Sequence, residues 1–342
     1  MAYPTQAAIA LVAAMLSAGI GPAGFDPAIA RPIQASGETA VATPKSADST
    51  SRVPSHTRPI VAETAAVAPP VTALPATEPP RPRAYLFRGA MGPFFSRGID
   101  RLTDKIEQAG FAASVDEFTI CRFIADKAIR EYRENPAPIV LIGHSMGGYC
   151  SVKFAEILQG ENIPVSLVVT IDPAHVTPSV PLNVERFINI FLSKSVLGGG
   201  DVKPGKGYQG HYASFDLSEH DEVTHINIEK MDKVHAQLIS KILQLAKTPS
   251  KTADEAIPLR YVVPASADIE LWDSGVMVTA SAGDTLQSIA ASLHLPLWSL
   301  TQMNKGPDNM PLVPGERIIV PRHLAPLAEV SAHAPPSTDH KR

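Results

Sequence analysis

Cysteine is scarce in this sequence, since the 342 residues include only Cys121 and Cys150. No group of cysteine, histidine and carboxylate residues has the spacing of a metal site, so we expect neither a metal nor a cofactor. Two cysteines allow one disulfide. Both lie on amphipathic helical patterns, where a buried free thiol is the more ordinary outcome, and the sequence leaves the pairing open.

The chain also lacks a marked excess of charge of either sign. Its 30 basic and 34 acidic residues give a net charge of −4, and neither sign is strongly clustered. Such a balance provides no electrostatic attraction for nucleic acid or for an anionic membrane surface. We therefore expect neither of them as a partner.

No lysine or arginine precedes Arg31, yet the N-terminus otherwise has the pattern of a secretory signal peptide. An apolar run over residues 7–20 is followed by Ala28-Ile29-Ala30, a candidate cleavage site. The run is short for a membrane span, although an uncleaved anchor is an alternative. We expect residues 1–30 to be a signal peptide, the protein to be periplasmic or associated with the cell wall, and the mature chain to have no membrane span.

Aromatic residues are absent from residues 31–82, which hold ten of the 32 prolines. Such a stretch cannot bury enough apolar surface to offset the entropy cost of ordering it. It is therefore predicted to be a disordered linker. Residues 248–276 are predicted to be a second linker, and residues 323–342 a disordered tail.

Between Arg83 and Lys247 apolar runs alternate with amphipathic helical patterns. The pattern predicts an α/β fold, in which helices cover both faces of a parallel sheet. The runs predicted as strands are 85–87, 113–118, 139–142, 165–171 and, more weakly, 187–192 and 212–215. The segments predicted as helices are 99–109, 121–132, 147–160 and 234–242.

A G-x-S-x-G motif, Gly143-His144-Ser145-Met146-Gly147, joins the apolar run 139–142 to a helical pattern. In this context the serine occupies a sharp strand-to-helix turn, and the two glycines keep side chains away from it. The amide of Met146 then faces the developing oxyanion. We predict Ser145 as a nucleophile.

A serine hydroxyl needs a general base, and the base needs an acid to orient it. His225 lies on a loop late in the domain and is the first candidate for the base, with His211 and His220 as alternatives. Asp172 ends the strand after the nucleophile strand and is the first candidate for the acid. Asp216 is its competitor.

The glycine-rich turn 89–92 follows the first predicted strand. Ala90 or Met91 in this turn is expected to supply the second oxyanion amide, because glycine lets the backbone approach a substrate closely. His144 is expected to pack or to form hydrogen bonds beside the nucleophile.

With these features, residues 83–247 resemble the α/β-hydrolase superfamily in a short lipase-, esterase- or thioesterase-like form. The resemblance implies a compact α/β-hydrolase sheet and an ester or thioester substrate. It also implies a triad of Ser145, His225 and Asp172. The acid follows the strand after the G-x-S-x-G turn, and this placement resembles a subset of lipases. The short length of the region implies that no large cap domain is present.

A second pattern, strand-helix-helix-strand, covers residues 278–321. Asp284 and Gln287 fit a helix N-cap and its partner three residues later. Residues 277–322 resemble a LysM domain, which binds N-acetylglucosamine-containing glycans such as peptidoglycan. The resemblance implies a sugar site formed by Gly283, Asp284, Thr285, Asn309, Met310, Pro311 and Leu312.

Three hypotheses follow from these patterns. The first is an exported serine hydrolase that cleaves esters or thioesters and is tethered to the wall by its LysM module. The second is a deacylase or amidase that acts on peptidoglycan itself. The third is a wall-binding protein without catalytic activity.

Overall fold

The computed structural model of the chain describes residues 80–90, 92–245 and 256–322. The predicted signal peptide, nearly all of the linker over 31–82, and the C-terminal tail lie outside these residues. Met91, one of the two candidates for an oxyanion amide, also lies outside them.

A seven-stranded sheet forms the centre of the molecule, with all neighbouring strands parallel in the order β2-β1-β3-β4-β5-β6-β7. The predicted parallel α/β sheet is therefore confirmed. Every residue of β3 and β4 is buried and most are apolar, as expected for strands inside a parallel sheet. The strands are β1 (Arg83–Arg88), β2 (Ala112–Glu117), β3 (Ile139–His144), β4 (Leu167–Ile171), β5 (Arg186–Phe191), β6 (His211–Asp216) and β7 (Leu259–Val262).

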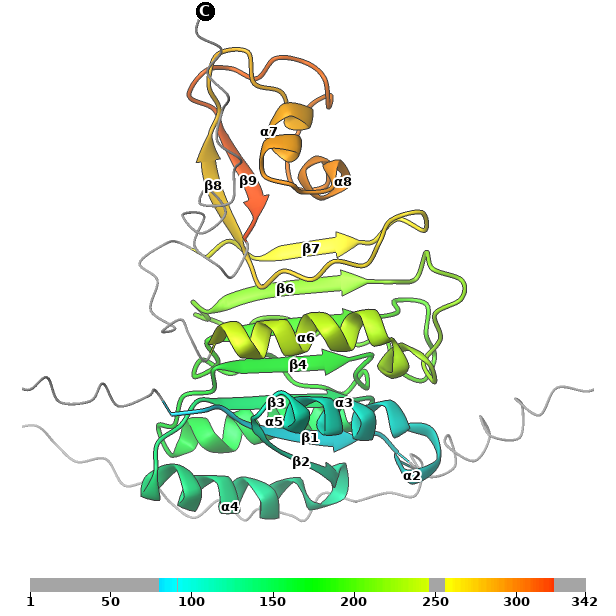
Figure 1. The fold of residues 1–342 in the computed structure, drawn as a ribbon, viewed down its shortest axis with the longest axis vertical. Coiled ribbons are helices and arrows are strands. Elements are labelled where there is room, and N and C mark those ends of the chain that lie inside the picture. The colour runs from blue at the N-terminus through cyan, green and yellow to red at the C-terminus, as the bar shows by residue number, and fades with distance from the viewer. Residues whose placement is uncertain (1–79, 91, 246–255, 323–342) are drawn as a thin grey trace, which may run out of the picture. The chain divides into compact units, whose positions relative to one another are not determined.

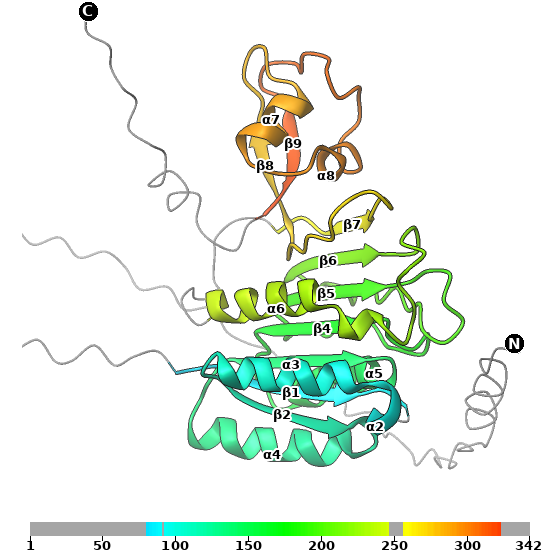
Figure 2. The same ribbon diagram turned by 45° about the vertical axis from the view of Figure 1, so that its right-hand side comes forward.

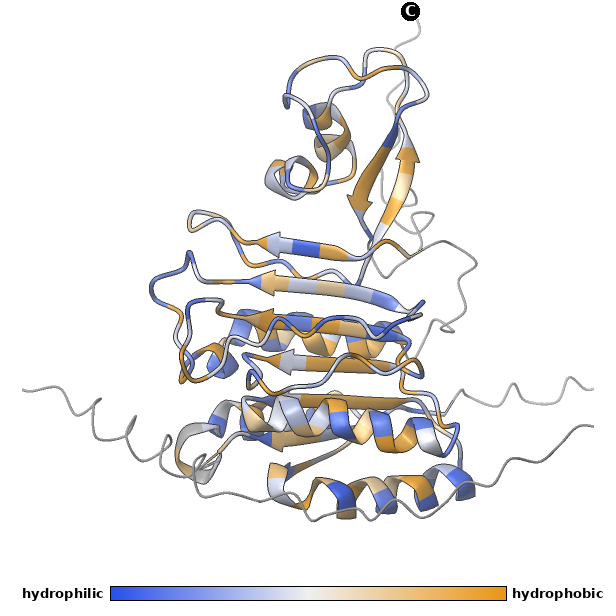
Figure 3. Cartoon of the chain, turned by 180° about the vertical axis from the view of Figure 1, so that it is seen from behind, coloured by the Kyte–Doolittle hydropathy of each residue, from blue (hydrophilic) through white to orange (hydrophobic). Residues whose placement is uncertain are grey.

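Helices cover both faces of the sheet because successive strand residues point to opposite sides. In β3, Val140 and Ile142 pack with α3 (Arg97–Gln108) and α6 (Asp232–Leu245), which lie in front of the sheet in Figure 1. Ile139 and Leu141 pack on the other face with α4 (Cys121–Glu134) and α5 (Met146–Gly160). Figure 2 gives a second view of these layers, and Figure 3 shows from behind that the central strands are mostly hydrophobic.

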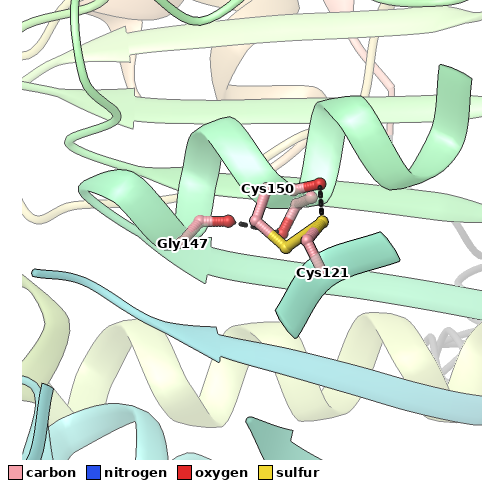
Figure 4. Close-up of a disulfide and its surroundings, with 4 residues drawn as sticks. Cys121, Gly147 and Cys150 are labelled. Atoms are coloured by element: carbon pink, nitrogen blue, oxygen red, sulfur yellow. Dashed lines mark hydrogen bonds between the residues drawn. A yellow bond between two sulfur atoms is a disulfide. The ribbon is translucent and has the colours of Figure 1, made fainter. Parts of the chain in front are cut away.

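The helices on that second face are α4 (Cys121–Glu134) and α5 (Met146–Gly160). A disulfide joins Cys121, the first residue of α4, to Cys150 in the second turn of α5 (Figure 4). The more ordinary outcome for two buried helical cysteines, free thiols, is thus not the one observed. The two Cα atoms lie 5.8 Å apart because α4 and α5 pack side by side, which the sequence pattern alone does not show.

The predicted linker over residues 248–276 is wrong for its described part. Residues 259–262 form β7, which pairs with β6 as the last strand of the sheet. Leu259 and Tyr261 are buried, whereas Arg260 and Val262 are exposed, as expected for an edge strand. The seven-stranded sheet therefore continues beyond Lys247, the boundary predicted from the sequence.

The C-terminal part contains a two-stranded antiparallel sheet of β8 (Gly275–Thr279) and β9 (Arg317–Pro321). Two short helices, α7 (Leu286–Ser292) and α8 (Leu297–Thr301), lie between them in sequence. The N-cap of α7 is Thr285, which forms a capping box with Ser288, and not Asp284 as predicted. The helix begins one residue later than predicted, and the Asp284 carboxylate instead accepts a hydrogen bond from the Ser281 amide.

Aromatic side chains join the C-terminal part to the edge of the large sheet. Trp298 of α8 packs edge-on against Tyr261 at 5.2 Å between ring centroids and lies 5.8 Å from Trp272. Phe215 of β6 extends the same cluster. The Gln302 side chain adds two hydrogen bonds to the backbone of Val262 in β7. One hydrophobic core thus runs from the sheet into the C-terminal part.

The remaining short helical segments are α2 (Gly92–Phe95), η1 (Phe118–Ile120) and η2 (Ile228–Lys230). Among the described residues, every helix is too short or too polar to cross a membrane.

Candidate active site

Ser145 lies at the predicted turn between β3 and α5, in a strained backbone conformation with φ 55° and ψ −120°. Non-glycine residues with positive φ are uncommon and cluster at functional sites. The two glycines of the motif are required by close packing. A Cβ on Gly143 would lie 2.0 Å from the Gly147 oxygen, and one on Gly147 would lie 2.1 Å from the Phe87 oxygen. The sequence therefore presents Ser145 at the carboxyl edge of the sheet.

Backbone hydrogen bonds connect this turn to the end of β4. The Ser145 amide donates to the Ile171 oxygen at 3.0 Å, and the Ala174 amide donates to the Ser145 oxygen at 3.2 Å. Asp172, between them in the neighbouring loop, also has a positive φ of 40°. Both turns are thus held in unusual backbone conformations beside one another.

Asp172 and His225 are brought together by the fold. His225 Nδ1 lies 2.6 Å from Asp172 Oδ2, so the imidazole N–H donates to the carboxylate. The other carboxylate oxygen accepts the amides of Leu192 at 3.0 Å and Gly199 at 2.8 Å. The Asp172 side chain is fully buried and the His225 side chain is 14% exposed. The carboxylate is therefore fixed, and it orients an imidazole that retains access to solvent.

The alternative acid and bases occupy other positions. Asp216 accepts the amides of Ser193 and Ser218, both at 3.0 Å, and these bonds lower the pKa of its carboxyl although burial opposes them. His211, at the beginning of β6, pairs with Ser274 Oγ at 2.8 Å. His220 pairs with Glu222 at 3.2 Å. None of these three contacts involves Asp172 or the Ser145 turn.

His144 is buried beside Ser145 and does form hydrogen bonds, as expected. Its Nδ1 lies 2.9 Å from Ser96 Oγ, and its Nε2 lies 2.8 Å from the backbone oxygen of His225. Burial, with a smaller contribution from the nearby His225, lowers the pKa of His144 to about 3. The two imidazole rings are 4.7 Å apart. His144 is thus a neutral side chain in contact with the candidate base.

Sequence reasoning did not identify Ser96. Ser96 Oγ accepts the Gly89 amide at 3.1 Å and contacts His144, while its residue is only 1% exposed. The one signal in the sequence is its place directly before a helix, which is typical of an ordinary N-cap serine. In the structure this side chain makes no capping hydrogen bond and points to the site instead.

The described part of the candidate oxyanion turn, Gly89 and Ala90 (hereafter the oxyanion turn), lies against the candidate nucleophile, Ser145. A Cβ on Gly89 would lie 2.9 Å from Ser145 Cβ and 3.1 Å from the His144 oxygen, so only glycine allows this approach. Ala90 follows in the turn. Met146 is the first residue of α5, where backbone amides have no partner within the helix. These amides are the candidates for oxyanion binding.

The two segments predicted to bind glycan also lie side by side. The Leu312 amide donates to the Asp284 oxygen at 2.7 Å, and the Gln287 amide donates to the Asp308 oxygen at 3.0 Å. Met310, in the second of these segments, is 57% exposed. Asn304 has a structural role, since its side chain bonds Leu300 and both backbone groups of Ile319.

Comparison with known proteins gives one family match, between residues 278–321 and the LysM domain. A search of curated proteins found no match. These residues therefore agree with the predicted LysM module over nearly its whole length.

Solved structures with similar folds include a protein described as a hydrolase of the alpha/beta superfamily from Xanthomonas campestris pv. campestris. It is 17% identical, with a TM-score of 0.31, and the match covers 47% of this chain and 99% of that one. A metagenome-derived lipolytic enzyme is 13% identical at a TM-score of 0.31, covering 49% and 94%. A thioesterase from the prodiginine pathway of Streptomyces coelicolor is 17% identical at a TM-score of 0.21, covering 30% and 47%. Likenesses this low carry no conclusion about activity.

Proposed function

We propose that this chain is an exported serine hydrolase that cleaves carboxylic esters or thioesters and is anchored to the cell wall by its LysM module. The observation that carries the proposal is the 2.6 Å hydrogen bond from His225 to the buried Asp172, beside a serine in a strained strand-to-helix turn. A nucleophile, a base and an orienting acid form the unit that acyl transfer requires, and their order along this chain, Ser145, Asp172 and His225, is the order typical of an α/β-hydrolase.

In the proposed reaction, Ser145 Oγ attacks the acyl carbonyl while His225 Nε2 accepts the hydroxyl proton. The tetrahedral intermediate collapses to an acyl-serine, and His225 returns the proton to the departing alcohol or thiol. Water, deprotonated by the same imidazole, then releases the acid and restores Ser145. Asp172 keeps the proton of His225 on Nδ1, and the amides of Met146 and of Ala90 or Met91 stabilise the oxyanion.

Exposed apolar side chains on the loops and helix starts that follow strands at the same sheet edge support an acyl substrate. Parallel strands all end at one edge, and large apolar residues follow five of those ends. An acyl chain gains free energy by covering such surface. The residues are Phe94, Phe123, Val176, Val196 and Ile226, which are between 43% and 80% exposed.

A fluorophosphonate probe tests the catalytic proposal, because it phosphonylates only an activated serine. The probe is expected to label the full-length protein, and S145A is expected to abolish labelling and to reduce ester hydrolysis roughly 10³-fold or more. H225A added to S145A should cost little further, since members of a triad act as a unit. Full activity of S145A on every ester tested would reject the proposal that this chain is a serine hydrolase.

The LysM match supports anchoring to a glycan, and a disulfide supports an oxidising compartment and hence export. Pulldown with purified peptidoglycan tests the anchor. We expect M310E, which places a charge at an exposed position of the second candidate glycan segment, to reduce retention. V313E is the matched control, because Val313 is 68% exposed next to the same loop. Equal retention of the wild type, M310E and V313E on peptidoglycan would count against the proposed glycan site.

A second candidate function is deacylation or amide cleavage within peptidoglycan, which the LysM match favours because it would hold the enzyme on that substrate. Nitrophenyl esters of increasing chain length, compared with acetylated peptidoglycan, separate the two. Activity restricted to peptidoglycan would support the second function. No labelling by the probe, together with peptidoglycan binding, would instead indicate a wall-binding protein without catalysis.

A further inference from the structure

His144, Ser96 and Gly89 form one chain of buried hydrogen bonds that the catalytic reaction as proposed above does not use. The Gly89 amide donates to Ser96 Oγ at 3.1 Å, Ser96 Oγ meets His144 Nδ1 at 2.9 Å, and His144 Nε2 meets the His225 oxygen at 2.8 Å. The chain begins in the oxyanion turn and ends on the backbone of the candidate base. It passes through the residue next to the nucleophile.

The directions of these bonds follow from the groups involved. The His225 carbonyl oxygen can only accept, so the His144 proton is on Nε2. A neutral imidazole then has a lone pair on Nδ1, which accepts the Ser96 hydroxyl proton. Ser96 Oγ keeps a lone pair for the Gly89 amide. Every donor therefore has an acceptor, and one tautomer of His144 satisfies the whole chain.

We propose that His144 is a positioning residue, which holds the oxyanion turn and the backbone of His225 in register on either side of Ser145. Ser96 connects Nδ1 of His144 to the oxyanion turn by a hydrogen bond to the Gly89 amide. His225 lies in the loop between β6 and η2, and a hydrogen bond to Asp172 holds its side chain. A second restraint on its backbone limits the motion of the imidazole relative to Ser145.

Neutral His144 also suits the charge that develops during the reaction. His225 becomes an imidazolium when it accepts the serine proton, and the His144 ring lies 4.7 Å away. A cation at this distance would oppose that step. Because burial keeps His144 neutral at any ordinary working pH, it restrains the base without repelling its charged form.

The inference rests on the proposed hydrolase activity, so two kinds of measurement are needed. The first is independent of activity: ¹⁵N spectra of the histidine rings should show His144 as a neutral ring with its proton on Nε2. A ring protonated on Nδ1, or on both nitrogens at neutral pH, would overturn the hydrogen-bond chain.

The second measurement is steady-state hydrolysis of one ester by the full chain. We expect S96A and H144A to lower kcat roughly 10- to 100-fold with little change in KM, because small displacements of reacting groups are costly and neither side chain is proposed to touch substrate. H144Q, which can donate from near the position of Nε2, should recover part of the loss. H235Q is the matched control, since His235 is equally buried and also bonds a backbone oxygen, that of Glu229.

Unchanged kcat in both S96A and H144A, with a labelled wild-type protein, would overturn the positioning role. If H144A does not fold, S96A and the ring spectra decide. A wild-type protein that neither reacts with the fluorophosphonate nor cleaves esters would refute the proposed function itself, and the two failures are thereby distinguished.

Discussion

At the scale of single residues, the choice of acid depends on which carboxylate meets the imidazole. Asp172 contacts His225 at 2.6 Å, whereas Asp216 serves the amides of Ser193 and Ser218. Asp172 directly follows β4 and Asp216 ends β6, two parallel strands of one sheet with β5 between them, so both lie at the same sheet edge and their positions in the sequence rank them only weakly. Their partners in the fold separate them clearly.

We therefore expect D172N to reduce kcat on an ester substrate roughly 10²- to 10⁴-fold, because an amide in this position no longer holds the base in its reactive tautomer. D172N should fall less far than S145A. D216N should be nearly silent in kcat, which makes it the matched control. A large loss of kcat in D216N with a small loss in D172N would show that the acid is assigned to the wrong residue. That result would still agree with the proposed hydrolase function.

Much of this site was predictable because its signals are local. The G-x-S-x-G turn needs two glycines, a serine and a strand-to-helix transition within a few residues, and the sequence shows all of these around Ser145. Ser96 was missed because its partners, Gly89 and His144, are 7 and 48 residues away, and only the fold brings them to one hydroxyl. Its role depends on tertiary contacts that no local pattern encodes.

At the scale of elements, the disulfide joins α4, which precedes β3, to α5, which follows the Ser145 turn. It closes a loop with a sequence separation of 29 that contains α4 after its first residue, β3 and Ser145. Helical periodicity placed each cysteine on an apolar face but said nothing of which helices are neighbours. The pairing was therefore left open by the sequence and is decided by the packing of α4 on α5.

Removing this bond is expected to lower the free energy of unfolding by about 3–4 kcal/mol, from the entropy that a loop of this length returns to the unfolded chain. Urea denaturation of the oxidised protein and of C121A/C150A measures the change. The oxidised and reduced wild-type proteins provide the control for the altered side chains. Equal midpoints in all samples would show that the bond does not restrain the unfolded chain.

A buried carboxylate links the segment η2 to α3. Glu229 is fully buried, and a Cβ on Gly98 in the first turn of α3 would lie 2.2 Å from its Oε2. Burial raises the pKa of Glu229 from its ordinary value to about 7, while Lys230, with Nζ 3.7 Å from Oε1, opposes the change. The folded protein thus binds a proton here more tightly than the unfolded chain does.

The sign of the pH dependence follows from that difference. Between the unfolded pKa near 4.5 and the folded pKa of about 7, the folded state binds more protons. The free energy of unfolding should therefore fall as the pH rises through this window, with a slope of at most about 1.4 kcal/mol for each pH unit. E229Q, which resembles the protonated form, should lose this slope in urea titrations at several pH values. An identical slope in both proteins would exclude Glu229 as its source.

At the scale of the whole molecule, the LysM module and the large sheet share a core. Sequence patterns predicted two domains separated by a linker, because β7 is only four residues long and alternates buried with exposed side chains. Such a short strand gives a weak signal. Its pairing with β6, and the aromatic contacts beyond it, follow from side chains far apart in sequence. Deleting residues 277–322 would thus also uncover part of the core of the large sheet, so single substitutions test the candidate glycan site better.

The shared core predicts that both parts unfold together. The only two tryptophans, Trp272 and Trp298, lie in the aromatic cluster that joins them, so their fluorescence reports on that contact. Fluorescence and ester hydrolysis should be lost in one coincident transition on heating. W298A should lower the stability of the catalytic part by about 2 kcal/mol or more, because it removes a large side chain packed on Tyr261 and Trp272.

V313A is the control for this prediction, since Val313 belongs to the same module but is 68% exposed. For W298A, loss of activity at a lower temperature than in the wild type would show that the module supports the sheet that carries Ser145. The opposite result has a distinct signature. If fluorescence and activity are lost at well separated temperatures, and W298A leaves the activity transition unmoved, the two parts fold independently and the contact between them contributes little to the catalytic sheet.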